Sequence, residues 1–293
     1  MMNQPGNQKP IFWLSFLPPT IWLLIFLLVP LSIIGVLSFS EKQGLIDIEI
    51  SWVFDNYMRA ADPVYLSVFI KSIGIAGITT IICFVVGFPI ALGIFSAPKN
   101  WKPILLMLVI LPFWVNLLIR TYALIAVFRT QGFFNYALEW FSSLLAIPFD
   151  PLPLLYNNTA VVLGLVYIHL PFMILPLYAG LEGFNKSLLE AALDLGASQS
   201  KALISILTPI IAPAIVSGCV LVFIPALGSY LTPNLLGGTD SQMIANVIER
   251  QFKNANDWPF GAALSMTLIY LTFGFLALRS LWLKRHRNYS LKS

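Results

Sequence analysis

The sequence predicts an all-α, polytopic membrane protein with six transmembrane helices. Of its 293 residues, 58% are hydrophobic and only 10% are charged, whereas about 25% of the residues in an average soluble domain are charged. The apolar residues gather in runs of about 20, the length at which a helix crosses a bilayer. We therefore expect one transmembrane domain over residues 1–293, with a core helical bundle at about 60–285.

Hydropathy places the six spans in order along the chain. They are expected at about 11–37, 67–95, 104–128, 160–181, 210–231 and 260–283. The first is longer than the apolar region of a cleaved signal peptide, so we expect it to remain as an anchor. Lysine and arginine are more frequent in the loops on the side of the termini, and the positive-inside rule then predicts that both termini are cytoplasmic.

Two loops on the opposite side have structure of their own in this prediction. Aromatic residues in the first, around Trp52 and Tyr57, indicate a segment packed against the ends of the spans. Residues 131–147 are predicted to form a short interfacial helix, because they are rich in aromatic residues and leucine and poor in charge. Pro148 follows directly and should end it, since proline lacks the amide hydrogen.

Several classes of function find no support in the composition. The formal net charge of +4 comes from cations scattered between apolar runs, so nucleic-acid binding is not expected. Cys83 and Cys219 each lie inside an apolar run, and His169 has no carboxylate at helical spacing, so we expect packing residues and no metal site. The chain also lacks a phosphate-cradling G-x-x-x-x-G-K-[ST] loop and a catalytic triad, so we expect no catalytic residues.

A polar segment at 186–209 interrupts the apolar pattern between the fourth and fifth spans. Ser187 and Glu190 have the spacing of a capping box, which predicts a helix start. Gly196 should end this helix, because glycine adopts the left-handed conformation without a Cβ clash. A second helix is expected from about Ser198, with Pro209 interrupting it at the entrance to the fifth span. The segment is thus predicted to be a cytoplasmic helix-turn-helix.

Two interpretations of this segment follow from the residues alone. Glu190 and Asp194 lie one turn apart, so both carboxylates project from one face, and like charges at that spacing mildly destabilise the helix. Docking of a soluble partner would account for keeping them. An ordinary amphipathic loop on the membrane surface is the alternative.

The run Glu190-Ala191-Ala192, followed by Gly196 and by Leu207-Thr208-Pro209, resembles the EAA signature of permease subunits of bacterial ATP-binding-cassette (ABC) importers. Thr208 stands between the family's usual leucine and proline, and the spacing is otherwise kept. The resemblance implies the type I importer transmembrane fold in the bacterial inner membrane.

In that family this segment docks in a cleft of a cytoplasmic ABC ATPase dimer, and the ATPase, not the permease, binds ATP and Mg²⁺. The resemblance therefore implies no cofactor on this chain, a second permease subunit that is usually a distinct chain, and an extracytoplasmic substrate-binding protein. The coupling residues that it implies are Glu190, Ala191, Ala192, Asp194, Gly196 and Pro209.

Other segments are similar to spermidine and putrescine permeases. They are residues 112–122, 225–238, 251–252 and 257–261. This similarity implies import of polyamines from the outside or periplasm. Some polyamine permeases carry acidic residues near Ser229 and at Asn234, and both positions are uncharged here, so a polycation gains less from these two sites.

Candidate residues of the substrate pathway cluster in the third and fifth spans. They are Trp114, Asn116, Arg120, Tyr122, Ser229, Tyr230 and Asn234. Trp114 and Tyr122 could hold ammonium groups by cation–π attraction, although aromatic residues in spans more often only pack. Arg120 is either a pathway residue or, as we favour, a structural or gating residue, because a cation is a poor ligand for a polycation.

Pro225 and Gly228 interrupt the fifth span and free backbone carbonyls, which is tolerated only where the backbone faces protein or a cavity. The function that the sequence favours is therefore ATP-driven import by a permease subunit. An importer of another small solute, or a secondary transporter driven by an ion gradient, is the alternative. The latter would need carboxylates within the spans, and none lies there.

Overall fold

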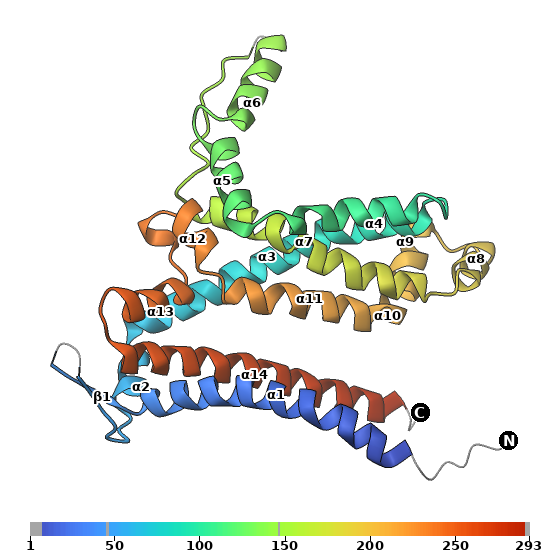
Figure 1. Ribbon diagram of the computed structural model, residues 1–293. Helices are drawn as coiled ribbons and strands as arrows, with labels where there is room; N and C mark the ends of the chain where they lie inside the picture. Colours follow the sequence, from blue (N-terminus) through green and yellow to red (C-terminus); the bar gives the residue numbers. More distant parts are fainter. Residues whose placement is uncertain (1–7, 45–46, 146, 291–293) are drawn as a thin grey trace. The chain divides into compact units, whose positions relative to one another are not determined.

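The structure is a computed structural model that describes residues 8–44, 47–145 and 147–290, and Figure 1 shows that most of them are helical. The all-α fold is thus confirmed. Contacts divide the chain into two compact units, each described by itself here: unit 1 holds residues 1–66 and 248–293, and unit 2 holds residues 67–247.

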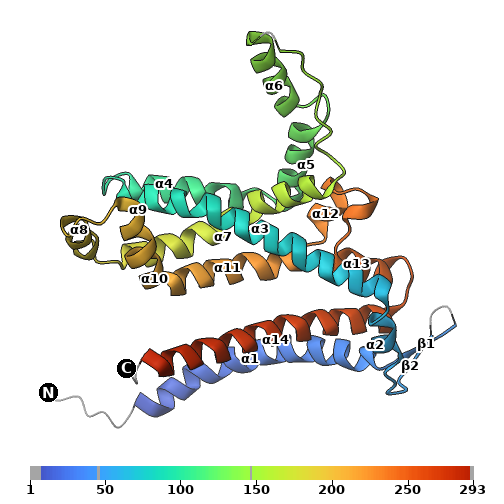
Figure 2. The same cartoon turned by 180° about the vertical axis from the view of Figure 1, so that it is seen from behind.

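Unit 1 is built on two long helices that lie side by side, α1 and α14 (Figures 1 and 2). Its elements are α1 (Gln8–Ser38), β1 (Glu41–Gln43), β2 (Asp47–Glu49), α2 (Asp55–Ala60) and α14 (Trp258–Ser290). The strands pair antiparallel, with Lys42 opposite Ile48. At Gly35 of α1 a Cβ would lie 4.0 Å from Cε of Met266 of α14, an ordinary van der Waals distance, so the two helices are in contact there.

The aromatic segment predicted around Trp52 and Tyr57 does pack against the end of the first span, in unit 1. Phe39, next to the end of α1, lies 5.2 Å from Tyr57 and 6.1 Å from Trp52, measured between ring centroids. The hydroxyls of Ser38 and Tyr57 are 2.7 Å apart and share a hydrogen bond. These contacts fix the loop that follows α1 against the helix end.

Unit 2 contains the remaining helices, and α3 and α13 cross the boundary between the units. They are α3 (Pro63–Ser96), α4 (Lys102–Ile110), η1 (Leu111–Trp114), α5 (Leu117–Phe128), α6 (Phe133–Leu144), α7 (Asn158–Glu182), α8 (Ser187–Asp194), α9 (Gln199–Ala202), η2 (Leu203–Leu207), α10 (Thr208–Ile210), α11 (Ala212–Leu227), α12 (Leu231–Leu236), η3 (Thr239–Ser241) and α13 (Ile244–Lys253).

The core of unit 2 lies where α3, α7 and α11 pack together, around Cys83, Met173 and Val222. Small residues allow this close packing. A Cβ on Gly218 of α11 would lie 2.8 Å from the sulfur of Met173, and one on Gly87 of α3 would lie 3.1 Å from its Cγ. Cys83 is fully buried, as expected of a packing residue.

Among the described residues, three helices are long and apolar enough to cross a membrane by themselves, within 15–38, 63–96 and 158–182. The third predicted span is not the continuous helix that hydropathy predicted, because the chain bends by 95° after Trp114. A second bend, of 73°, lies at Ile211, at the entrance to the fifth span. The helix α11 then continues through Pro225 and ends at Leu227, so of the two predicted interruptions only the one at Gly228 is present. The sixth corresponds to α14, whose side chains from residue 278 onward lie outside the described set.

The bend in the third span has a local cause. Pro112 lies in the 3₁₀ turn η1 and cannot donate a backbone hydrogen bond. Val115 is then extended, with ψ 134°. Asn116 starts a new helix, because its side-chain oxygen accepts the amide hydrogen of Leu118 at 2.8 Å. Beyond this point α5 and α6 turn away from α4 (Figure 1), and α6 is the helix predicted at 131–147.

Candidate coupling segment and substrate pathway

The helix α8 begins differently from the prediction. Ser187 is the first helical residue and not the cap. Oδ1 of Asn185 accepts hydrogen bonds from the Ser187 amide at 3.1 Å and from the Ser187 hydroxyl at 2.9 Å. The amide of Glu190 donates instead to the carbonyl of Lys186. The predicted capping box is therefore wrong, because Asn185 satisfies the helix start and occupies the serine hydroxyl.

The end of α8 confirms the role predicted for Gly196. Its φ is +86°, in the left-handed region. The amide of Gly196 donates to the carbonyl of Leu193 at 2.9 Å, and that of Ala197 donates to Ala192 at 3.0 Å. These two bonds form a Schellman motif, which satisfies carbonyls that the helix end would leave unpaired. The last helical residue is Asp194.

The second helix starts where predicted. The hydroxyl of Ser198 accepts a hydrogen bond from the amide of Lys201 at 3.4 Å, and α9 follows. The chain then forms the π-helical turn η2, in which the hydroxyl of Thr208 donates to the carbonyl of Leu203 at 2.9 Å. Pro209 lies inside the next short helix and does not end it. The bend comes at Ile211, two residues before Pro213.

One face of α8 packs on the rest of unit 2, and the other is exposed. Ala192 is buried, and Leu189 packs against the core cluster that includes Phe184 and Leu207. The opposite face leaves Glu190 and Asp194 exposed, together with Leu195 at 89% exposure. Figures 1 and 2 show α8 at one end of unit 2, beyond the ends of α7 and α10.

Basic residues connect this end of unit 2 to α3 and α4. The ammonium group of Lys186 lies 4.5 Å from the ring centroid of Phe95, near the end of α3. Lys102, the first residue of α4, pairs with Glu182, the last of α7, at 3.0 Å. These contacts link the start of α8 to the end of α3, and the start of α4 to the end of α7.

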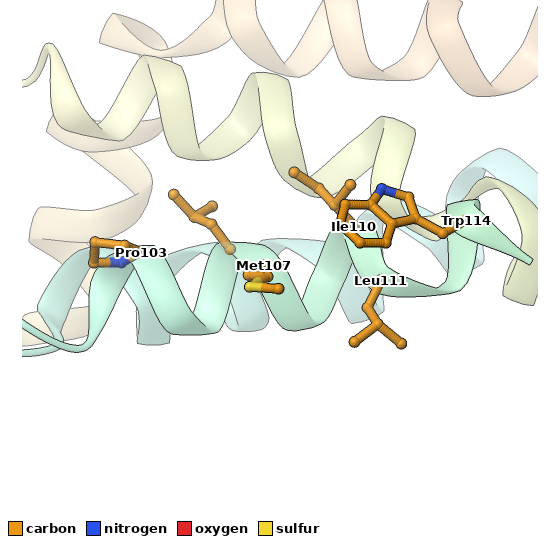
Figure 3. A pocket seen from close by; sticks show the side chains of 6 residues that line it. Pro103, Met107, Ile110, Leu111 and Trp114 are labelled. Atoms are coloured by element: carbon orange, nitrogen blue, oxygen red, sulfur yellow. The ribbon is translucent and has the colours of Figure 1, made fainter.

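The first pathway candidates lie at the break between α4 and α5. Trp114 is 78% exposed, and Tyr122 is 58% exposed. Trp114 ends a groove of about 310 Å³ along α4 that is lined entirely by apolar side chains. Figure 3 shows this groove from Pro103 at one end to Trp114 at the other. The face of Trp114 can take part in cation–π attraction, but this groove offers no carboxylate to a polycation.

Arg120 is buried, with 9% of its surface exposed, and does not snorkel. Its guanidinium carbon lies 5.4 Å from the ring centroid of Phe113. Phe113 in turn packs edge-on against Phe172, beside His169. No described residue accepts a hydrogen bond from Nε or Nη1 of Arg120. Arg120 is thus a buried cation that lies near the ring of Phe113, with two nitrogens that have no acceptor among the described residues.

His169 is an interior histidine, as predicted. A ring nitrogen lies 2.8 Å from the carbonyl oxygen of Leu165, one turn earlier on α7. Only 6% of its surface is exposed. The histidine is therefore a buried residue whose hydrogen-bond partner lies within its own helix.

The remaining candidates lie together at the end of the fifth span. The helix α11 ends at Leu227, directly before Gly228, and the linker leads into α12. Ser229 and Tyr230 form the linker, and Asn234 is exposed on α12. The candidates at the break before α5 and those around α12 lie on neighbouring elements, because α12 packs on both α5 and α7.

Sequence reasoning missed Asn246, which positions this linker. Its Nδ2 donates to the backbone carbonyl of Tyr230 at 2.7 Å, while its Oδ1 accepts the amide of Met243 at 3.1 Å. Asn246 is 2% exposed. The sequence carried no signal for it, because Asn246 shares a helix face with Arg250 and Lys253 and therefore reads as one more solvent-facing polar residue.

The sequence profile of a known family, described as "Binding-protein-dependent transport system inner membrane component", matches residues 78–281. The chain belongs to this family. It is therefore an inner membrane component of a transport system, and the family's members are not enzymes.

Curated relatives agree with this membership. The spermidine/putrescine transport system permease protein PotB of Salmonella typhimurium is 44% identical over 248 residues, which cover 84% of this chain and 85% of the relative. Its counterpart in Escherichia coli K12 is 43% identical and covers 84% and 88%, and that of Haemophilus influenzae is 38% identical and covers 85% and 86%.

Solved structures share the fold. A bacterial ABC transporter involved in the import of the acidic polysaccharide alginate has a chain that superposes with a TM-score of 0.73 at 18% identity, covering 95% of this chain and 96% of that one. The same transporter in complex with alginate pentasaccharide-bound periplasmic protein gives 0.71 at 17% identity, covering 93% of each. The transmembrane fold of an ABC importer is thus confirmed for this member of the family.

Proposed function

We propose that this family member imports polyamines, spermidine or putrescine, as the permease subunit of an ATP-driven transporter in the inner membrane. The observation that carries the proposal is the sequence identity of 38–44% to permeases named for spermidine and putrescine. It extends over 84–85% of the chain, including all of the candidate pathway residues and α8.

The exposed pathway candidates offer aromatic and polar groups that can bind the ammonium groups of a polyamine. Trp114, Tyr122 and Tyr230 present aromatic faces that attract ammonium groups more strongly once water is excluded. Backbone carbonyls near Gly228 can accept hydrogen bonds from the same groups. Ser229 and Asn234 add polar but uncharged contacts, so carboxylates that compensate the polycation would have to come from the second permease subunit.

Arg120 has a different role in this proposal. Its cation lies buried behind Phe113 and not in the apolar groove beside Trp114. Two positive charges repel strongly at low dielectric, so Arg120 would not touch the cargo. It would change its contacts when the pathway opens, which is a gating role and not a stabilising one.

The exposed face of α8 is the proposed docking site for the ATPase. Glu190, Asp194 and Leu195 combine charge and apolar surface on a helix whose other face is fixed to the core. Two copies of the ATPase would bind ATP and Mg²⁺, and α8 would transmit their closure to α7 and α11. This arrangement requires α8 and both termini on the cytoplasmic side, as the distribution of lysine and arginine favours.

A second permease chain and an extracytoplasmic substrate-binding protein would complete the transporter. The alginate importer was solved in complex with such a periplasmic protein. Unit 2 would supply the face of the pathway that contains α5 and α12, and the second permease subunit would supply the opposite face. We propose a distinct chain for that subunit, since it would supply the carboxylates that this one lacks.

The cargo can be tested on the binding protein encoded beside this chain. Calorimetric titration with spermidine, putrescine and an unrelated anion such as sulfate should give binding to one or both polyamines only. Binding of another solute with no response to either polyamine would refute the cargo and leave the importer function intact, as the uncharged Ser229 and Asn234 would allow.

A further inference from the structure

A groove of about 500 Å³ runs between α3 and α7 in unit 2, away from α8 and from the pathway candidates. It is lined by Lys71, Gly74, Ile75, Ile78, Ile82, Asn158, Thr159 and Val162. The polar residues gather at one end, where α7 begins, and the apolar residues occupy the rest. The groove is thus amphipathic along its length.

Lys71 places a positive charge at one end of this groove. Its side chain is half-buried, and it takes part in none of the ion pairs among the described residues. No aspartate or glutamate is among the described residues that line the groove. A half-buried lysine can lay its methylene stem on apolar surface while its ammonium group remains available to an anion.

Asn158 and Thr159 add hydrogen-bond donors beside this cation. Both are exposed, and they are the first two residues of α7. The side chain of the preceding residue, Asn157, is already used, because its Oδ1 accepts the amide of Ala160 at 2.8 Å. The amides of Asn158 and Thr159 belong to the helix start, which has no intrahelical acceptors for them.

From its charged end to its apolar end, the groove is about as long as one leaflet of a bilayer. The face of α3 from Lys71 to Ile82 is about 16 Å long at the helical rise per residue. This length matches one leaflet, about half of a hydrocarbon core of roughly 30 Å. Ile78 is 51% exposed within it, so the groove is open to its surroundings.

We propose that this groove binds an anionic phospholipid, with the phosphate at Lys71, Asn158 and Thr159 and an acyl chain along Ile75, Ile78 and Ile82. A lone cation beside an apolar channel of this length fits one charged headgroup with one hydrocarbon tail. The bound lipid would bridge the outer ends of α3 and α7, next to the core of Ile75, Val161 and Met243.

Native mass spectrometry of the assembled transporter with added phosphatidylglycerol or phosphatidylcholine tests this inference. We expect retained phosphatidylglycerol and little phosphatidylcholine. Lys71→Gln should lower phosphatidylglycerol retention about fivefold, the effect of one lysine charge on an anionic lipid. Lys71→Arg should restore it, and Lys99→Gln, which removes an exposed lysine outside the groove, should leave it unchanged.

Ile78→Trp provides a second test that keeps the charge, because it fills the apolar part of the groove and should also reduce retention. Equal retention of both lipids, or no effect of Lys71→Gln, would overturn the proposal. So would full competition by glycerol 3-phosphate alone, which would show an anion site without a lipid. Cross-linking of a cysteine at Ile78 to the second permease chain would identify a protein as the occupant and overturn it too.

Discussion

The amide of Gly196 donates to the carbonyl of Leu193 at 2.9 Å and turns the chain out of α8 with a φ of +86°. This single glycine separates α8 from α9. An alanine at this position has space, since no atom lies within 4 Å of its Cβ, so only the backbone conformation opposes it. The end of α8, and with it the position of its exposed face, therefore depends on the conformational freedom of glycine.

Replacing Gly196 should change coupling without unfolding the protein. Gly196→Ala is expected to cost about 1–2 kcal/mol of local stability, because a Cβ disfavours the left-handed region, and Gly196→Val should cost more. Hydrogen exchange should report faster opening of residues 193–198, and ATP-dependent uptake should fall. Gly93→Ala on α3 is the matched control, since it also has no atom within 4 Å and no positive φ. Equal uptake in all three variants would argue against the coupling role.

Charge on the exposed face of α8 should set the affinity for the ATPase. Glu190→Lys is expected to weaken association with the ATPase at least about tenfold, or about 1.4 kcal/mol, because it reverses a charge at the proposed interface. Membrane insertion should be unaffected. Glu139→Lys makes the same change on the exposed surface of α6 and should leave association intact. Association measured by surface plasmon resonance that is equal for both variants would place the ATPase elsewhere.

Arg120 is expected to be maintained for transport and not for stability. Its unpaired Nε and Nη1 are buried, and a buried donor without an acceptor costs about 1–3 kcal/mol. Arg120→Met should therefore raise the free energy of unfolding by a similar amount while lowering uptake. Thermal unfolding in detergent and uptake assays measure the two effects. Arg129→Met, at an exposed position after α5, should change neither.

The packing of α12 should be sensitive to any side chain at Gly164 of α7. A Cβ there would lie 2.8 Å from Leu236 and 2.9 Å from Thr232. Gly164→Ala is expected to destabilise the protein by about 1–3 kcal/mol, the usual cost of overpacking, and to displace the linker that contains Tyr230. Gly77→Ala on α3, with open space around it, should be neutral or stabilising. A Tm unchanged by Gly164→Ala would contradict this packing.

Hydropathy predicted the helical class and the polar segment well, because both depend on local composition. The end of α8 was predictable for the same reason, since Gly196 acts within one turn. The start was not, because Asn185 and Ser187 both have capping side chains and only the geometry decides between them. Pro112 and Asn116, which cause the break between α4 and α5, are residues that commonly interrupt or start helices. A hydropathy window averages over both, so it predicted one continuous span.

The candidate pathway was less predictable for a physical reason. Whether Arg120 snorkels or is buried depends on Phe113 and Phe172, which come from different helices, and sequence spacing does not report such contacts. The same holds for Asn246, whose partner Tyr230 lies on another element. Exposed positions such as Trp114 and Asn234 stay predictions, because the surface that would face them belongs to the proposed second subunit.

Uptake of radiolabelled spermidine into proteoliposomes is the measurement that tests the proposed function most directly. The vesicles would contain this chain with its ATPase and second permease, and the binding protein would be supplied outside. We predict accumulation that requires ATP inside, is inhibited by excess putrescine and persists when ionophores collapse the ion gradients. Accumulation that needs an ion gradient and not ATP, or none with either polyamine, would contradict it.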